Sequence, residues 1–159
     1  MTRNTSRPGE NLLIVDRVTE ADLDALALLL EELSGDPANR KRMIRELRAI
    51  RDDHSYILLG ARLDGVLAGT AMGILCRDLI GDCRPFMVVE NVIVSASVRG
   101  SGVGTALMNA LEREADARGC LYINIVSSIH RAGAHRFYES LGYPADAARG
   151  FRKYLREDR

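Results

Sequence analysis

The 159-residue sequence carries 22 basic and 22 acidic side chains, so its formal net charge at pH 7 is zero. This balance gives no electrostatic reason to expect binding to nucleic acid or to an anionic membrane surface. Aromatic residues make up 5% of the chain and tryptophan is absent, which argues against a stacking platform for single-stranded nucleic acid.

The cysteine pattern and the N-terminal segment indicate the compartment. Cys76, Cys83 and Cys120 are odd in number and lack Cys-x-x-Cys spacing, so neither a disulfide framework nor a zinc site is expected. Residues 1–10 are polar and lack the apolar core of a signal peptide. We therefore expect a cytoplasmic protein without a metal, in which residues 1–10 are a disordered leader and residues 11–159 form a single domain.

Two helices are predicted after a short first strand at residues 12–15. Thr19 is a typical N-cap residue, and the apolar residues after it recur at three- and four-residue spacing, which predicts a helix ending near Gly35. Asp36-Pro37 predicts the start of a second helix, because proline is tolerated in a first helical turn.

The second predicted helix carries many basic side chains. A run of this kind is usually a solvated face, and the alternative is a positive wall that recruits an anionic substrate. The residues concerned are Arg40, Lys41, Arg42, Arg45, Arg48 and Arg51.

Three antiparallel strands are predicted in the middle of the chain. Residues 56–62 and 66–76 flank Asp64-Gly65, which is a hairpin turn signal, and residues 86–94 follow as a third strand. Glycines inside the second of these strands indicate bulges or close contacts; they are Gly69 and Gly73.

The last third of the chain predicts two further helices and two further strands. A helix begins after Gly102, a strand covers residues 121–126, a helix covers residues 132–141, and residues 151–155 read as an edge strand. The predicted order is a strand, two helices, three antiparallel strands, a helix, a strand, a helix and a strand, which indicates a mixed α+β domain.

Three glycines, Gly100, Gly102 and Gly104, join the strand at residues 86–94 to the helix that follows. Glycines allow a ligand to approach the backbone closely. The first N–H groups of a helix lack internal partners and carry partial positive charge. Strand, glycine turn and helix together predict an anion site, for which a phosphate is the usual ligand.

Spacing separates the classes of protein that use such a turn. A P-loop requires a lysine after its last glycine, and none follows Gly104. A dinucleotide fingerprint requires a small residue where the β-branched Thr105 stands. The remaining pattern, Arg/Gln-x-x-Gly-x-Gly/Ala, is filled by Arg99, Gly102 and Gly104, and it resembles the pyrophosphate loop of the GNAT superfamily of acyl-CoA-dependent N-acetyltransferases.

A second motif, Ala-x-x-Phe-Tyr-x-x-x-Gly-Tyr, runs from Ala134 to Tyr143. It resembles the second signature of GNAT enzymes, and the two motifs stand in the family's order. The resemblance covers nearly the whole chain and implies the GNAT fold, an α+β domain whose mixed, mostly antiparallel central sheet is flanked by helices. The helix motif, with the ending Phe-x-Lys-x-Leu at residues 151–155, also resembles small-molecule amine acetyltransferases.

The resemblance implies acetyl-CoA as co-substrate. The backbone of residues 92–94 would hold the acetyl carbonyl and the pantetheine arm, and residues 99–105 would hold the pyrophosphate. Arg131 stands where the family often has an asparagine that contacts CoA, and it either meets a phosphate or stays on the surface. The implied cofactor-binding residues are Val92, Ile93, Val94, Arg99, Gly100, Ser101, Gly102, Val103, Gly104, Thr105, Arg131, Ala134 and Tyr138.

Acetyl transfer to an amine requires a base or a water relay, because an amine with a pKa of about 10.4 is mostly protonated at neutral pH. Glu90 is the leading candidate, since a carboxylate inside an apolar strand is costly without a function or a partner. The alternative is a structural hydrogen bond. Asn91 points to the opposite side of a regular strand, although a bulge exchanges the two.

Tyr138 matches the family tyrosine that protonates or hydrogen-bonds the CoA sulfur. The alternative is a tyrosine packed in the core with its hydroxyl satisfied. His130 and His135 are weaker candidates for the base, and His135 is expected to face solvent. The predicted catalytic residues are therefore Tyr138 and Glu90.

The sequence thus predicts an N-acetyltransferase that moves an acetyl group from acetyl-CoA directly to a primary amine in a ternary complex. The amine is expected to be a small metabolite or an antibiotic, entering beside the first two helices and the loop of residues 77–85. The alternatives are a protein N-terminal or lysine acetyltransferase and a non-catalytic acyl-CoA-binding regulatory module. No nucleic acid or membrane partner is expected, and a homodimer is a family-level expectation.

Overall fold

The computed structural model describes residues 12–155. They belong to two compact units, one extending to Asn124 and the other beginning at Ile125. The predicted leader, residues 1–10, lies outside the described residues, and the single domain over residues 11–159 stays a prediction.

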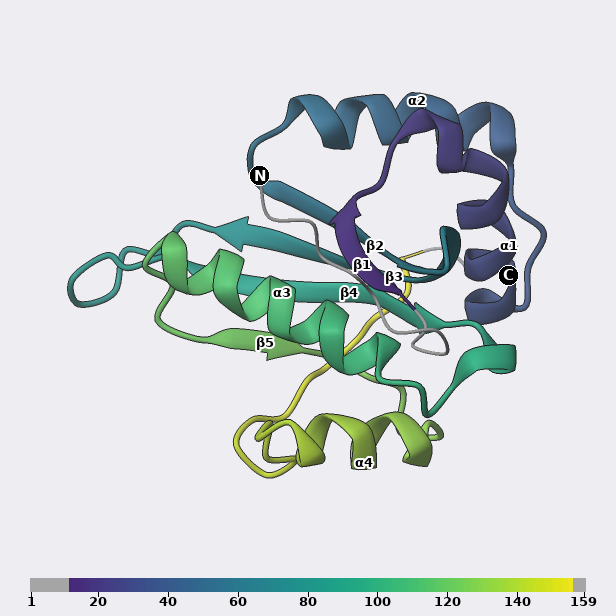
Figure 1. The fold of residues 1–159 in the computed structure, drawn as a ribbon. Coiled ribbons are helices and arrows are strands. Elements are labelled where there is room, and N and C mark those ends of the chain that lie inside the picture. The colour runs from purple at the N-terminus through teal and green to yellow at the C-terminus, as the bar shows by residue number, and fades with distance from the viewer. Residues whose placement is uncertain (1–11, 156–159) are drawn as a thin grey trace, which may run out of the picture. The chain divides into compact units, whose positions relative to one another are not determined.

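A five-stranded sheet organises the first unit (Figure 1). Its strands lie in chain order, and the first four pair antiparallel with their neighbours. The prediction of an α+β fold with a mostly antiparallel sheet is confirmed. The strands are β1 (Leu13–Arg17), β2 (Tyr56–Leu63), β3 (Val66–Cys76), β4 (Phe86–Val94) and β5 (Ile123–Ile125).

Helices cover both faces of this sheet. The helices α1 (Leu23–Ser34) and α2 (Arg40–Asp52) pack on one face, and α3 (Val103–Ala117) packs on the other (Figure 1). Alternate residues of β3 show the division, because successive side chains of a strand point to opposite faces. Gly73 lies against Leu111 of α3, whereas Met72 faces α1 and α2.

Close contact between elements explains the glycines of β3. A Cβ atom on Gly69 would lie 2.8 Å from the carbonyl oxygen of Ile93, and one on Gly73 would lie 2.8 Å from the sulfur of Met87. The predicted close contacts are therefore confirmed. The Asp64-Gly65 hairpin is confirmed as well, with positive φ at both turn residues, as a type I′ turn requires.

The start of α2 differs from the prediction. The helix begins at Arg40 rather than at Asp36-Pro37. The reason is the cap: the side-chain oxygen of Asn39 accepts a hydrogen bond from the backbone N–H of Arg42 at 3.0 Å. Asparagine is among the strongest N-cap residues, so its position determines where the helix starts.

The second unit contains α4 (Ala132–Ser140), where the sequence predicts a helix. The edge strand predicted at residues 151–155 is wrong, because this segment has no regular secondary structure. Its apolar side chains are exposed, Phe151 at 92% and Leu155 at 89%, so no burial of an apolar face stabilises a strand there. The predicted strand at 121–126 shortens to Ile123–Ile125.

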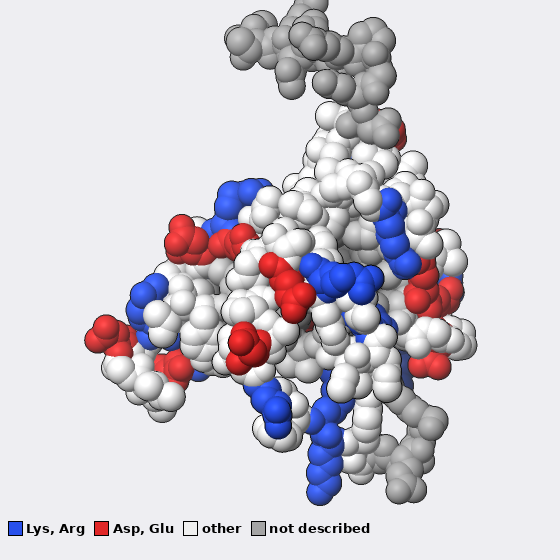
Figure 2. Space-filling model, turned by 90° about the horizontal axis from the view of Figure 1, so that it is seen from below, with Lys and Arg blue, Asp and Glu red and all other residues white. Residues whose placement is uncertain are grey.

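Charges are distributed without segregation by sign on the face shown in Figure 2, where basic and acidic side chains are interspersed. This agrees with the zero formal net charge of the sequence. Within residues 12–155, no helix combines the length and the apolar character that crossing a membrane requires.

A cluster of three charged residues connects β2 to β1 and to the segment just before α1. Arg62 of β2 donates to both carboxylate oxygens of Asp22, at 2.7 and 2.9 Å, and to Asp16 of β1 at 3.2 Å. The Asp22 carboxylate also accepts a hydrogen bond from the backbone N–H of Thr19. These bonds, above all those from Arg62, lower the pKa of Asp22 from 3.8 to about 2.

We expect Asp22→Asn to lower the free energy of unfolding by about 1–2 kcal/mol at pH 7, because a charge-assisted pair with little solvent exposure is lost. The pKa of Asp22 is lower in the folded state, so its contribution is complete above pH 4 and is lost as the pH falls towards 2. Urea unfolding at pH 7 and pH 3 measures the difference.

Asp24→Asn is the matched control, because Asp24 is 88% exposed in its pair with Arg40. Exposed pairs contribute little, so this variant should lose less than about 0.5 kcal/mol. Equal losses in the two variants would contradict a stabilising role for the ionised Asp22 carboxylate beside Arg62. A loss in Asp22→Asn that does not shrink at pH 3 would contradict it as well.

Candidate functional site: a bulged strand, a glycine turn and a pocket

Strand β4 contains a bulge at the predicted site. Met72 pairs with Glu90 and Thr70 pairs with Ile93, so one residue of β3 lies opposite two residues of β4. Asn91, inside the bulge, has a φ of 54°, in the left-handed region that asparagine tolerates better than most residues. The bulge allows Glu90 and Asn91 to leave strict alternation.

The bulge decides which residue faces the pocket beside it. Glu90 is half-buried and shares the face of its partner Met72, the face that α1 and α2 cover. Asn91 lines the pocket between these helices and the sheet. The sequence predicts Glu90 as the base and Asn91 as the residue that a bulge exchanges with it.

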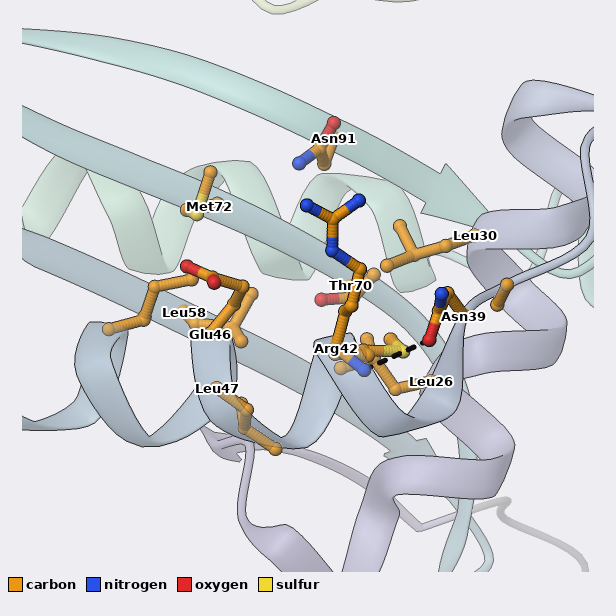
Figure 3. A pocket seen from close by; sticks show the side chains of 13 residues that line it. Leu26, Leu30, Asn39, Arg42, Glu46, Leu47, Leu58, Thr70, Met72 and Asn91 are labelled. Carbon is orange, nitrogen blue, oxygen red and sulfur yellow. Dashed lines mark hydrogen bonds between the residues drawn. The ribbon is translucent and has the colours of Figure 1, made fainter.

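The pocket has a volume of about 540 Å³ and lies between α1, α2 and strands β2 to β4. Figure 3 shows that its lining side chains come from both helices and from the sheet. This volume suits a small-molecule ligand. Most of the lining is apolar: Leu26, Leu30, Ala38, Met43, Leu47, Ile50, Leu58 and Met72.

Polar side chains complete the lining. Among residues 12–155, Thr70 is the only polar or charged residue that is buried. Its hydroxyl donates a hydrogen bond to the Leu59 carbonyl at 2.8 Å. The other polar residues of the lining are exposed and form a rim; they are Asn39, Arg42, Glu46 and Asn91. The pocket therefore has an apolar floor with charged and amide groups at its mouth.

The basic residues of α2 serve different purposes. Arg40 pairs with Asp24 and Glu31, and Arg48 and Arg51 both pair with Glu20. These pairs attach α2 to α1 and to the short η1 helix (Glu20–Asp22) before it. Half of the predicted basic run is thus paired with carboxylates.

Arg42 is different from its basic neighbours on α2. It lines the pocket, and its guanidinium extends from α2 towards Asn91 (Figure 3). Across residues 12–155 its side chain has no hydrogen-bond or ion-pair partner. Neither Arg45 nor Arg48 lines the pocket, so a positive wall along the whole helix is not what the structure shows.

The glycine turn has the geometry of an anion site. The short helix η2 (Ala96–Val98) follows β4, and α3 then begins with Gly102 as its N-cap, at a φ of 85° and without a side-chain cap bond. A Cβ atom at Gly100 or Gly102 would meet nothing within 4 Å. The backbone at the start of this 15-residue helix is therefore open to a ligand.

Arg99 holds the turn in place. Its guanidinium donates to Glu32 of α1 at 2.7 Å and to the Val94 carbonyl at 3.2 Å, while the same Glu32 oxygen accepts from the N–H of Ala96 at 3.0 Å. The side chain of Arg99 is thus occupied by the protein itself. Its predicted contact with a pyrophosphate stays a prediction.

In the second unit, Tyr138 is half-buried on α4. Its ring makes an edge contact with Tyr143, with centroids 6.4 Å apart, and a tilted contact with Phe137 at 5.3 Å. The aromatic residues of the second motif therefore form one cluster. Arg131 is the exposed N-cap residue of α4, and Ala134 is half-buried in its first turn.

His135 corrects an expectation. It is half-buried rather than solvent-facing, and its Nε2 lies 2.9 Å from the Ser128 carbonyl oxygen, to which it must donate. That nitrogen is therefore not available to accept a proton in this arrangement. His130 is exposed. Among residues 12–155, no group of three or more metal-binding side chains is present.

The model of the acetyltransferase (GNAT) family matches residues 23–143. Glucosamine 6-phosphate N-acetyltransferase 1 from Oryza sativa subsp. japonica is 30% identical over 119 residues, which are 72% of this chain and 70% of the rice protein.

Solved structures share the fold. Glucosamine-6-phosphate N-acetyltransferase from Arabidopsis thaliana superposes with a TM-score of 0.81 and 18% identity, over 91% of this chain and 99% of that one. An aminoglycoside N-acetyltransferase in complex with CoA superposes with a TM-score of 0.80 and 19% identity, over 94% of this chain and 99% of that one.

We expect Gly102→Ala to lower the free energy of unfolding by about 1–2 kcal/mol, because a residue with a Cβ is strained at this positive φ. The added atom meets nothing within 4 Å, so the loss comes from the backbone alone. Gly102→Asn is the matched control and should lose less, since asparagine tolerates this region. Urea unfolding measures both; an alanine variant as stable as the wild type would show that the turn relaxes.

Proposed function

The chain belongs to the acetyltransferase (GNAT) family, and on this premise we propose that it transfers the acetyl group of acetyl-CoA directly to the primary amine of a small molecule. Both substrates are bound together, and no covalent intermediate on the protein is required. The cytoplasmic location and the homodimer stay predictions.

The observation that carries the proposal is the position of the pocket relative to β4. The pocket reaches the strand at Asn91, in the bulge, and the predicted pantetheine contacts begin at the next residue, Val92. The same stretch of chain continues into the glycine turn. An amine in the pocket and a thioester along β4 would therefore meet at the bulge, where reacting atoms must be held close together.

The residues present fit acetyl-CoA. The open backbone at Gly100 and Gly102 and the uncapped start of α3 match the needs of a pyrophosphate. The aminoglycoside enzyme of the same fold was solved with CoA, which supports this assignment. When bound, acetyl-CoA supplies an acetyl group activated as a thioester.

Two residues of this chain handle the protons. Glu90, directly or through water, takes the proton that the amine must lose before its nitrogen can bond to the acetyl carbon. The nitrogen adds to the acetyl carbonyl carbon, and the carbon–sulfur bond then breaks while Tyr138 donates the proton that the departing sulfur requires. The second proton that the nitrogen loses as the amide forms restores the Tyr138 hydroxyl. These two roles belong to different units of the chain.

The small-molecule class of the amine is supported by the relatives. The rice and Arabidopsis proteins are named for glucosamine 6-phosphate, and the enzyme solved with CoA is named for aminoglycosides. Both names describe amines of low molecular mass. The closed floor and limited volume of the pocket favour a compact acceptor as well.

We expect Tyr138→Phe to lower kcat about 10²-fold or more, with the KM for acetyl-CoA little changed, because the ring stays and only the proton donor is lost. Steady-state turnover over a panel of primary amines measures this. Tight binding of CoA without turnover of any amine would instead favour the regulatory module, and turnover of peptides alone would favour a protein acetyltransferase.

Glu90→Gln tests the base. The amide keeps the shape of the side chain but cannot accept the proton, so kcat/KM should fall about 10²-fold or more. An unchanged kcat/KM would assign proton removal to a water relay that does not involve Glu90. Asn91→Ala, measured in parallel, separates a loss of base from a loss of pocket shape.

A further inference from the structure

We infer that the acceptor is an amphipathic amine, with an apolar body and an anionic group that Arg42 binds. The inference rests on the proposed function and specifies its substrate. It differs from the polar amines for which the related enzymes are named. Three properties of the pocket support it: the chemistry of the floor, the state of Arg42 and the charge balance of the rim.

The floor offers almost nothing to a polar ligand. Leu26 and Leu47 are 2% and 5% exposed and close the bottom of the pocket. The one hydroxyl there, that of Thr70, already donates its proton to the Leu59 carbonyl. A sugar ring placed on this surface would leave hydroxyls unpaired, at about 1–3 kcal/mol for each buried group, whereas an alkyl or aryl group would be stabilised by its burial.

Arg42 is the basic side chain of the pocket lining, and no described residue pairs with its guanidinium. Arg40, Arg48 and Arg51 on the same helix are held by carboxylates, while Arg42 has no such partner within the described chain and reaches over the pocket towards Asn91 (Figure 3). A guanidinium presents a planar fork of donors that matches a carboxylate or a phosphoryl group in two hydrogen bonds.

Glu46 determines the balance of charge. It lies one turn after Arg42 on α2, and its side chain also projects towards the sheet (Figure 3). The rim thus carries one positive and one negative group rather than an acidic cluster. A polycation finds a single carboxylate there and meets the guanidinium as a like charge, whereas an amine that carries its own anion finds a complementary partner for each charge.

The test measures binding of amines in the absence of acetyl-CoA, by calorimetry, and then turnover in its presence. The probes are L-leucine, its phosphonate analogue, L-leucinamide, glucosamine 6-phosphate and an aminoglycoside. Leucine and leucinamide differ only in the anionic group, and the phosphonate analogue distinguishes a phosphoryl group from a carboxylate. We expect the two anionic leucine analogues to bind about tenfold or more tighter than the amide, as one charge-assisted fork predicts.

Variants of α2 identify the responsible side chain. Arg42→Met keeps an apolar stem of similar length and should abolish the difference between leucine and leucinamide, while Arg42→Lys should keep part of it. Arg45→Met is the matched control, since Arg45 lies on the same helix and does not line the pocket; it should bind all probes as the wild type does.

The outcomes separate the two proposals. Binding of anionic amines that depends on Arg42, without acetyl transfer to any of them, would support the ligand class and overturn the proposed function. Acetyl transfer to the aminoglycoside or to glucosamine 6-phosphate in preference to the leucine analogues would keep the function and overturn the inference. Equal binding of leucine and leucinamide to the wild type, no binding of either anionic analogue, or an undiminished difference in Arg42→Met would also overturn it.

Discussion

At Gly69 the main chain of β3 lies so close to β4 and α3 that no side chain fits between them. A Cβ atom there would come within 2.8 Å of the Ile93 carbonyl and 3.0 Å of Val103. Ile93 is the first paired residue after the bulge, and Val103 is the first residue of α3. Because residue 69 has no side chain, β3 can lie close to both β4 and α3 at this point. This close packing sets the distance between the bulge in β4 and the first turn of α3.

The rest of the site depends on this fixed distance. The bulge turns Asn91 into the pocket and leaves Glu90 on the face of Met72. The turn after it is held by Arg99 and Glu32. On the other side, α2 packs against α1 through the apolar cluster that contains Leu26, Leu29 and Leu47. At the surface, Arg40, Arg48 and Arg51 of α2 pair with carboxylates of α1 and η1. Arg42 lines the pocket, and its side chain has no partner within the described residues.

Much of this architecture could be predicted from local sequence patterns. The bounds of β3 and β4 agree with the prediction, because a hairpin signal and an apolar run specify them locally. The glycine turn and the helix motif were sufficient to identify the family. The start of α2 was not predicted correctly, although Asn39 is visible in the sequence, because Pro37 is an equally acceptable starting signal.

Other features depend on contacts that no local pattern contains. Which arginine of α2 meets a carboxylate depends on the positions of Asp24, Glu31 and Glu20 in space, so a run of six basic residues could not reveal that Arg42 is the one at the pocket. The register shift at Asn91 depends on pairing with β3. The tail at residues 151–155 has the composition of a strand, but composition alone does not supply a neighbour to bury its apolar side chains.

The hydrogen bond between Arg99 and Glu32 connects the glycine turn to α1. Glu32 belongs to α1, the same helix that contributes Leu26 and Leu30 to the pocket. The glycine turn and the wall of the pocket are therefore linked through one charge-assisted hydrogen bond. If a ligand at the turn strengthens this bond and thereby restrains α1, thermodynamic reciprocity requires that a ligand which restrains α1 favours occupancy of the turn to the same extent.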